Sequence, residues 1–265
     1  PDPERSIQII ERAADQSNVD ARQMLSRIYQ EKGDLATAIE HCRMAAIQGS
    51  PPAQNQLAVF YAEGHDGVPA DQDAAKTWFE KAAEQGFVPA YLNLALFLKK
   101  NQGDPAEIIR LARQAADDNF LPAIYTIGVW YRDGEILTKD PYAAEGWFRR
   151  AAQRGFLDAQ VNLAHLLEAR CRKPADFKEP LDLYTSAAKA GHPVAHLHLG
   201  RLLSSGRFGE ENRPLGYAHL AVAAESGLSA AEAIRDAMVP PLSTEEITVA
   251  AEAWEQMEAK PWKAE

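Results

Sequence analysis

Residues 67–90 read GVPADQDAAKTWFEKAAEQGFVPA, and this stretch decides the architecture of the chain. It contains an Asp, a run of helix length, an Ala-Ala pair, a Gly and a further Ala. The first Ala of such a pair recurs at positions 13, 45, 82, 115, 151, 187 and 223, with gaps of 32, 37, 33, 36, 36 and 36 residues. A fixed period of this size indicates an array of structural repeats.

Each unit contains one helix, which we call helix B, with a recognisable start and end. Eleven residues before each pair is a side chain that can cap a helix by accepting from first-turn N–H groups. These residues are Asp2, Asp34, Asp71, Asp104, Asp140, Asp176 and Asn212. Four residues after the first Ala is a residue that can end a helix in the left-handed conformation, with Ser17 the least suited. These residues are Ser17, Gly49, Gly86, Asn119, Gly155, Gly191 and Gly227.

A second helix, helix A, is predicted to open at a further Ala in each unit. These residues are Ala21, Ala53, Ala90, Ala123, Ala159, Ala195 and Ala231. Apolar residues follow at positions i, i+4, i+5 and i+8, as in Ala53, Leu57, Ala58 and Tyr61, which places them on one helix face. The small residue after the Leu allows a neighbouring backbone to approach, and we expect Trp78-Phe79 and Trp147-Phe148 to fill the space between units.

The pattern resembles Sel1-like repeats, a variant of the tetratricopeptide repeat. The residues that carry the resemblance are Gly67-Val68, Asp71, Ala75, Trp78-Phe79, Lys81-Ala82-Ala83 and Gly86, and again Gly134, Asp140, Ala144, Trp147-Phe148, Ala151-Ala152 and Gly155. The first and third units are shorter, and the fifth and sixth have Leu183-Tyr184 and His219-Leu220 in place of the Trp pair. The resemblance implies a right-handed α-solenoid that binds other proteins, and it implies no catalytic residue.

We therefore predict an all-α fold, a right-handed α-α superhelix of about six to seven helix pairs with a C-terminal capping helix. The array covers residues 2–235, with units at 2–20 (a half-repeat), 21–52, 53–89, 90–122, 123–158, 159–194 and 195–230. Residues 231–265 form a partial repeat, broken at Pro240-Pro241, and the capping helix. Ser243 and Glu246 fit a capping box at the start of that last helix.

Composition narrows the class of partner. The formal net charge of −10 argues against nucleic acid, which needs a basic footprint. No apolar run approaches the ~20 residues of a membrane span, so we expect no membrane insertion.

Cys42 and Cys171 lie four units apart, and we predict no disulfide between them. Their free thiols do not exclude the bacterial periplasm, which we favour over the cytoplasm. The start at Pro1, without a Met, is consistent with a removed leader or earlier repeats.

A row of residues beside the apolar stripe of helix A is the candidate binding site, because helices A line the inner surface in the family that the chain resembles. The row begins with the polar residues Gln23, Arg27 and Gln30. The candidate partner-binding residues are Asn55, Val59, Leu92, Leu96, Lys99, Tyr125, Val129, Arg132, Val161, His165, Glu168 and Arg201. The middle of the row is apolar, which is typical of a groove for a peptide or helix.

We expect Leu92, Leu96, Tyr125 and Val129 to form the centre of this groove. Lys99, Arg132 and Arg201 would set charge complementarity at its edge. The alternative is that the curvature of the array buries the apolar members of the row between neighbouring helices.

Metal, cofactor and enzyme signals are weak. His192 and His196 have a metal-compatible spacing, but His192 precedes Pro193 outside the first turn, and His198 points elsewhere, so we predict no metal. We expect no cofactor and no catalytic residue, because the motifs for hydrolysis and phosphate binding are absent. The alternative from a different functional class is an enzyme, a hydrolase that acts on cell-wall or lactam substrates. It would rely on Glu168 with His165, and it lacks a nucleophile.

The sequence thus favours a non-enzymatic module, expected to be a monomer, that binds another protein. One use is an immunity protein that neutralises a secreted bacterial effector. The other is a scaffold for the assembly of envelope or polysaccharide machinery, or for signalling, with a component of that machinery as partner.

Overall fold

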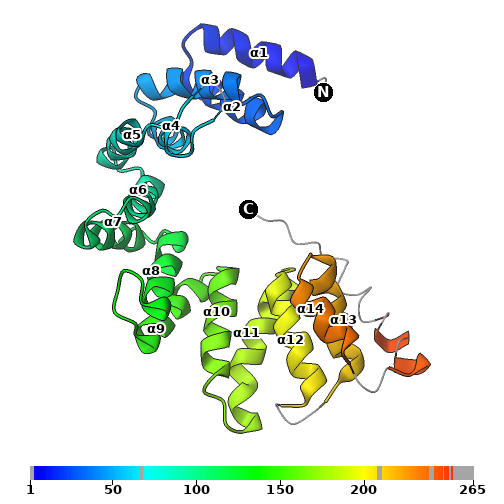
Figure 1. Ribbon diagram of the computed structural model, residues 1–265. Coiled ribbons are helices and arrows are strands. Elements are labelled where there is room, and N and C mark those ends of the chain that lie inside the picture. The colour runs from blue at the N-terminus through cyan, green and yellow to red at the C-terminus, as the bar shows by residue number, and fades with distance from the viewer. Residues whose placement is uncertain are drawn as a thin grey trace. The chain divides into compact units, whose positions relative to one another are not determined.

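The computed structural model describes residues 3–65, 68–207, 211–238, 242–246, 248–250 and 252 (Figure 1). The named elements are α1 (Pro3–Asp15), α2 (Val19–Glu31), α3 (Leu35–Ile47), α4 (Pro51–Glu63), α5 (Gln72–Glu84), α6 (Val88–Lys100), α7 (Pro105–Asp117), α8 (Leu121–Asp133), α9 (Pro141–Ala152), α10 (Leu157–Glu168), the 3₁₀ helix η1 (Pro174–Phe177), α11 (Lys178–Lys189), α12 (Pro193–Ser205), α13 (Arg213–Glu225) and α14 (Ser229–Asp236). The predicted all-α repeat fold is confirmed.

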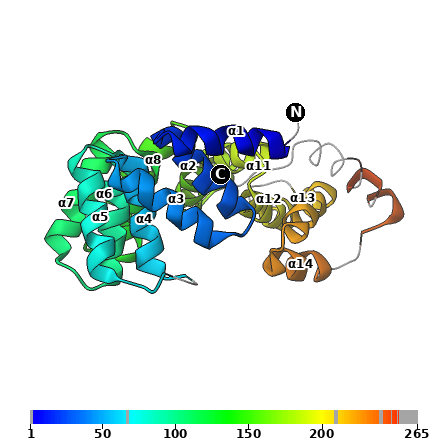
Figure 2. The same ribbon diagram turned by 90° about the horizontal axis from the view of Figure 1, so that it is seen from above.

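Helices A and B alternate as expected. The A helices are α2, α4, α6, α8, α10, α12 and α14, and the B helices are α1, α3, α5, α7, α9, α11 and α13. Each A helix begins two residues before the Ala that marks it in the sequence. The chain divides into two compact units, Pro1–Thr126 and Ile127–Glu265, with the division inside α8. Figure 2 shows the same helices from above.

Helix B begins where the sequence predicts in most units. Asp34 Oδ1 accepts from Thr37 N at 3.1 Å, and Asp71 Oδ1 accepts from Ala74 N at 2.9 Å. Asp140 Oδ1 accepts from two first-turn N–H groups at 2.9 and 3.0 Å. Asp104 and Asn212 cap α7 and α13 in the same way. Asp2 lies outside the described residues.

The prediction for Asp176 is wrong, because this residue does not cap α11. Asp176 lies in η1, and its Oδ2 accepts from the backbone N–H of Arg172 at 2.9 Å and of Lys173 at 3.1 Å. Both donors precede it in the chain, so its carboxylate closes the turn before the helix. α11 then starts at Lys178, after Phe177, without a side-chain cap.

All seven predicted helix ends have positive φ, from 60° at Asn119 to 95° at Gly49. Ser17 also adopts this conformation, at 64°, although its Cβ makes the left-handed region unfavourable. The residues that spacing alone predicts as helix ends are therefore the points where the backbone reverses between helix B and the next helix A.

Small residues allow neighbouring helices to pack at short distance. The marking Ala of helix A is buried in all seven units, and so is Ala151 of an Ala-Ala pair. A Cβ added to Gly200 on α12 would lie 2.6 Å from Leu220 Cγ and 2.9 Å from the Gly216 carbonyl oxygen on α13. This distance leaves no room for a side chain, which explains the small residue after the Leu of helix A.

The aromatic pairs are only partly as expected. Phe79 and Phe148 are buried and fill the space between helices, as predicted. Trp78 and Trp147 stay half-exposed, with Lys81 and Arg150 over their rings. In each pair the second aromatic residue therefore forms the core, and the first covers its edge.

The predicted capping box at the C-terminal end is confirmed. Glu246 N donates to Ser243 Oγ at 3.2 Å, and Ser243 N donates to Glu246 Oε2 at 2.7 Å. Residues 244–246 and 248–250 are helical. Pro240 and Pro241 lie outside the described residues.

Candidate functional site

The first compact unit contains half of the predicted row. Asn55 and Val59 lie on α4, Leu92, Leu96 and Lys99 on α6, and Tyr125 on α8. α4 and α6 lie on one side of this unit, with α5 and α7 on the other (Figure 1). The two A helices are joined by a hydrogen bond in which Asn93 Nδ2 donates to Asn55 Oδ1 at 2.9 Å.

The apolar residues in this half of the row differ in how far they are exposed to solvent. Leu92 is only 5% exposed and belongs to the helix packing, whereas Leu96, one turn further along α6, is 40% exposed. Asn55, Val59, Lys99 and Tyr125 are half-buried. The alternative of burial between helices therefore applies to Leu92, and Leu96 is the apolar residue of this half that is open to solvent.

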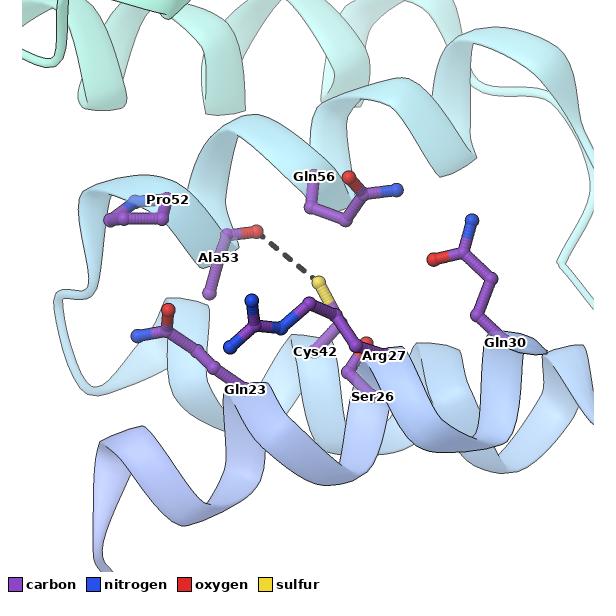
Figure 3. A pocket seen from close by; sticks show the side chains of 8 residues that line it. All are labelled: Gln23, Ser26, Arg27, Gln30, Cys42, Pro52, Ala53 and Gln56. Atoms are coloured by element: carbon purple, nitrogen blue, oxygen red, sulfur yellow. Dashed lines mark hydrogen bonds between the residues drawn. The ribbon is translucent and has the colours of Figure 1, made fainter. Parts of the chain in front are cut away.

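A hollow of about 200 Å³ lies at the polar beginning of the row, between α2 and α4 (Figure 3). Its lining residues are Gln23, Ser26, Arg27, Gln30, Cys42, Pro52, Ala53 and Gln56. Gln23, Arg27 and Gln30 are the three residues that the sequence pattern places at this end of the row. Gln23 Nε2 donates to Oγ of Ser50, the residue that caps α4, at 2.6 Å, so one wall is anchored to the next helix.

The second compact unit contains the other half of the row. Val129 and Arg132 lie on α8, Val161, His165 and Glu168 on α10, and Arg201 on α12. Val161 is buried, His165 is exposed, and Val129 is half-buried. Arg132 donates to Asn162 on α10 and to Asp133 beside it. Arg132 thus bridges two A helices as well as lying on their surface.

Glu168 is the centre of a polar cluster in this unit. The residue is 5% exposed, and its Oε1 accepts from Arg201 Nη2 at 2.5 Å. Tyr184 Oη, on α11, donates to Oε2 at 3.1 Å, and Arg207 Nη1 lies 3.5 Å from Oε1. His198 stacks on the Tyr184 ring, with centroids 4.8 Å apart. The cluster joins α10, α11 and α12.

The environment of Glu168 keeps it ionised. Burial alone would raise the pKa of Glu168, but the hydrogen bond and charge of Arg201, with Tyr184, hold it below its ordinary value. Burial and the neighbouring Glu168 charge raise the pKa of Tyr184, so its hydroxyl remains a donor. Burial lowers the pKa of His198 to about 4, and the Arg201 charge acts in the same direction. The cluster is therefore one carboxylate held by cationic and neutral donors.

Sequence reasoning placed Glu168 and Arg201 in the row but did not pair them, and it missed Tyr184, His198 and Arg207. One signal was available for Tyr184. It lies 36 residues after Phe148, so a Tyr occupies the buried aromatic position of its unit. A buried hydroxyl needs a partner, and this requirement points to a polar group inside the core.

The remaining histidines face different partners. His192 precedes α12, and its Nε2 lies 3.1 Å from Asp158 Oδ1. His196 Nε2 contacts the Ala188 carbonyl oxygen at 3.0 Å, and its Nδ1 lies 2.9 Å from His219 Nδ1. A carbonyl can only accept, so His196 carries its proton on Nε2, and His219 donates to its Nδ1. Within the described ranges, no three His, Cys, Asp or Glu residues are placed to hold a metal ion.

Both cysteines are buried free thiols, Cys42 in the first unit and Cys171 in the second. In the part of the chain that the structure describes, no helix has the length and apolar character needed to cross a membrane.

Comparison with known families identifies the repeat. The sequence model of the Sel1 repeat matches residues 1–18, 26–50, 51–87, 121–156, 157–192 and 193–228, which is more than half of the chain. Residues 88–120, which contain most of the short unit 90–122, lie between two matched segments.

Two curated proteins share part of this sequence. Chitin synthase regulatory factor 3 of Schizosaccharomyces pombe is 30% identical over 171 residues, covering 59% of this chain and 18% of that protein. The uncharacterized protein NMB1327 of Neisseria meningitidis is 28% identical over 167 residues, covering 62% of this chain and 34% of that protein. The matched region is thus about a fifth to a third of the length of these relatives.

Solved structures share the fold. A protective antigen of uropathogenic Escherichia coli with an SLR fold has a TM-score of 0.70 at 22% identity, covering 98% of this chain and 67% of that one. Immunity protein Pa5087 of Pseudomonas aeruginosa has a TM-score of 0.51 at 17% identity, covering 77% and 80%. At these identities the likeness concerns the fold.

Proposed function

The chain belongs to the Sel1 repeat family, and from this premise we propose that it is a non-enzymatic module that binds a partner protein through its A helices. The Sel1 repeat is a protein-interaction fold. The proposed contact residues are the exposed and half-buried members of the row in each compact unit. Leu96 is the apolar contact in the first unit, and His165 and Arg201 are polar contacts in the second.

One observation carries this proposal. One buried position of helix A keeps the same residue throughout the array, since the Ala that marks this helix is buried in every repeat. The row positions on the same helices change from unit to unit, from Asn and Val on α4 to Leu and Lys on α6 and to His on α10. Packing therefore does not dictate the chemistry of the exposed members of the row, such as Leu96 and His165, which leaves these residues available for recognition.

The groups around Glu168 support a non-enzymatic role. A general acid needs a proton near neutral pH, and the lowered pKa of Glu168 leaves it ionised. Burial raises the pKa of the Cys171 thiol, and the charge of Asp176 adds to this effect, so the thiol is not activated as a nucleophile. This chemistry favours an ion-pair cluster over the hydrolase alternative.

The specific use that we propose is neutralisation of a secreted bacterial effector, in the periplasm. Solved immunity proteins of Pseudomonas aeruginosa have this fold, so the fold is compatible with that task. An inhibitor of this kind would form one tight, stoichiometric complex, and fractionation of cells would locate it.

A second candidate is a scaffold or regulator of polysaccharide-synthesising machinery. The observation that favours it is the 30% identity to a protein named as a chitin synthase regulatory factor. A scaffold of this kind would be recovered with several components at lower affinity.

The test is capture from cells with two matched variants. Leu96→Glu changes the exposed residue of the row on α6, and Ile47→Glu changes a residue on the B helix α3 that is 68% exposed. We expect Leu96→Glu to lose the partner and Ile47→Glu to retain it, with both variants folded by circular dichroism. Equal capture by both variants would rule out the row on α6 as the contact.

A further inference from the structure

The hollow between α2 and α4 has the size of a single side chain. Its volume of about 200 Å³ is below the roughly 300–1,000 Å³ of small-molecule pockets. Gln23, Arg27 and Gln30 are spaced so that they share one face of α2, and Pro52 and Gln56 face them from α4 (Figure 3). The hollow therefore lies between two helices, and each helix contributes side chains that could contact a ligand.

Three polar side chains of these walls, Arg27, Gln30 and Gln56, are available to a ligand. Within the described residues, no ion pair or hydrogen bond engages the guanidinium of Arg27 or the carboxamides of Gln30 and Gln56. Among the described residues that line it, one side chain is cationic and none is a carboxylate. Because the whole chain has a formal net charge of −10, this hollow is a local exception that favours a single negative charge.

The floor of the hollow is neutral and largely apolar. Cys42 Sγ donates to the Ala53 carbonyl oxygen at 3.3 Å. Burial raises the pKa of the Cys42 thiol to about 12, so no thiolate competes for Arg27. Ala53 and Pro52 complete an apolar surface against which methylene groups can pack.

We propose that this hollow binds a glutamate side chain of the partner protein. The carboxylate pairs with the Arg27 guanidinium, which can donate two parallel hydrogen bonds to it. The two methylene groups lie on Ala53, Pro52 and Cys42. The carboxamides of Gln30 and Gln56 each supply a donor and an acceptor, which suits the main chain on either side of the glutamate. This assignment rests on the proposed function, because it names the chemistry of the partner at one point of the same A-helix surface.

The first experiment uses small probes and the full chain. Acetyl-glutamate amide, its neutral isostere acetyl-glutamine amide, and acetyl-glycine with a free carboxylate are titrated while the Arg27 Nε–H and the Gln30 and Gln56 amide signals are followed by NMR. We expect saturable shifts with the glutamate probe, at least about tenfold weaker with the glutamine probe. Tighter binding of acetyl-glycine would assign the hollow to a chain terminus and overturn the proposal, as would equal binding of the two amides.

A matched charge reversal provides the second experiment. Arg27→Glu removes the cation from the hollow, and Arg43→Glu makes the same charge change on the exposed side of α3. We expect Arg27→Glu to abolish the probe-induced shifts and Arg43→Glu to preserve them. Circular dichroism confirms that both variants are folded.

The partner captured from cells separates this inference from the function on which it rests. If the partner binds the parent and Arg27→Glu equally, the glutamate assignment fails while the interaction function stands. If no protein is captured by the parent although the glutamate probe binds at Arg27, the interaction function fails.

Discussion

Arg201 Nη2 on α12 lies 2.5 Å from Glu168 Oε1 on α10, and the pair joins two successive A helices of the second unit. Glu168 is buried, whereas the Arg201 side chain is 33% exposed. The first compact unit, Pro1–Thr126, has a neutral counterpart, which is the hydrogen bond from Asn93 on α6 to Asn55 on α4. Residues of the predicted row therefore also set the spacing of the A helices.

Removing one partner of this ion pair should destabilise the second compact unit, Ile127–Glu265. Arg201→Met leaves the Glu168 carboxylate without its closest donor, and we expect a loss of about 2 kcal/mol in unfolding free energy, less than for a fully buried pair because Arg201 is partly solvated. Unfolding in urea, monitored by circular dichroism, measures this change in the free energy of unfolding. Arg172→Met, at an exposed arginine, is the control and should be neutral. Equal effects of the two variants would show that the pair contributes nothing.

Stability should fall as the pH is lowered below about 6.5. Burial lowers the pKa of His198 to about 4 and that of His219 to about 3, so both residues are neutral in the folded chain over a range in which the unfolded chain binds protons. Their contribution is complete above the unfolded pKa of about 6.5 and is lost towards the folded values, with a slope of up to about 1.4 kcal/mol per pH unit for each histidine.

Urea midpoints between pH 7.5 and 4.5 test this dependence. We expect His198→Gln to flatten the dependence relative to the parent, because the variant has one buried titrating group fewer. Parallel curves for parent and variant would contradict the assignment.

Two leucines on one helix should differ in how much stability the same substitution costs. Leu94 is 4% exposed and Leu96 is 40% exposed on α6. Leu94→Asp places a charge in the core and should cost about 4 kcal/mol or more, whereas Leu96→Asp should cost less than about 1 kcal/mol. Thermal melts of both variants measure the difference. A cooperative parent-like melt for Leu94→Asp would mean that the core of this unit is misplaced.

Gly200 and Gly146 form a second matched pair. A Cβ at Gly200 would meet Leu220 and the Gly216 carbonyl oxygen, while one at Gly146 on α9 would meet no atom of the described part of the chain within 4 Å. We expect Gly200→Ala to cost about 1–3 kcal/mol through overpacking. Gly146→Ala should stabilise the fold by about 0.5–1 kcal/mol through helix propensity. Chemical denaturation of the two variants compares them, and a stabilised Gly200→Ala would exclude the close approach of α12 and α13.

The helix caps allow a fifth prediction. Asp140 caps α9 by accepting from two backbone N–H groups, so Asp140→Ala should cost about 1 kcal/mol. Asp117 is an exposed carboxylate at the end of α7, where the helix dipole disfavours negative charge. Asp117→Ala should therefore be neutral or slightly stabilising, by about 0.3–1 kcal/mol. The same denaturation assay separates the two variants, and a neutral Asp140→Ala would argue against the cap.

Most of the secondary structure could be predicted because its signals are local. A cap such as Asp71 bonds an N–H group three residues away, and a stop such as Asn119 depends on its own φ. Asp176 is the exception, because its oxygen is taken by Arg172 and Lys173 before α11 begins. Spacing to the next Ala-Ala pair contains no information on that competing turn.

The candidate site was predictable only as a helix face. Helical periodicity placed Leu92 and Leu96 on that face, but their exposures of 5% and 40% depend on the rotation of α6 against its neighbours. In the same way, the three residues at the beginning of the row were visible as a polar group, while the hollow opposite Gln56 required the position of α4.

The sequence by itself determined the repeat, the helices and nearly all of their ends, because those features arise from interactions within a few residues of the chain. Tertiary structure alone decided the pairing of Glu168 with Arg201, the link between Asn93 and Asn55, and the place of the Arg27 guanidinium in the α2–α4 hollow. These contacts join residues 33 and 38 positions apart. They depend on how each helix pair packs on the next, which a hydrophobic period does not specify.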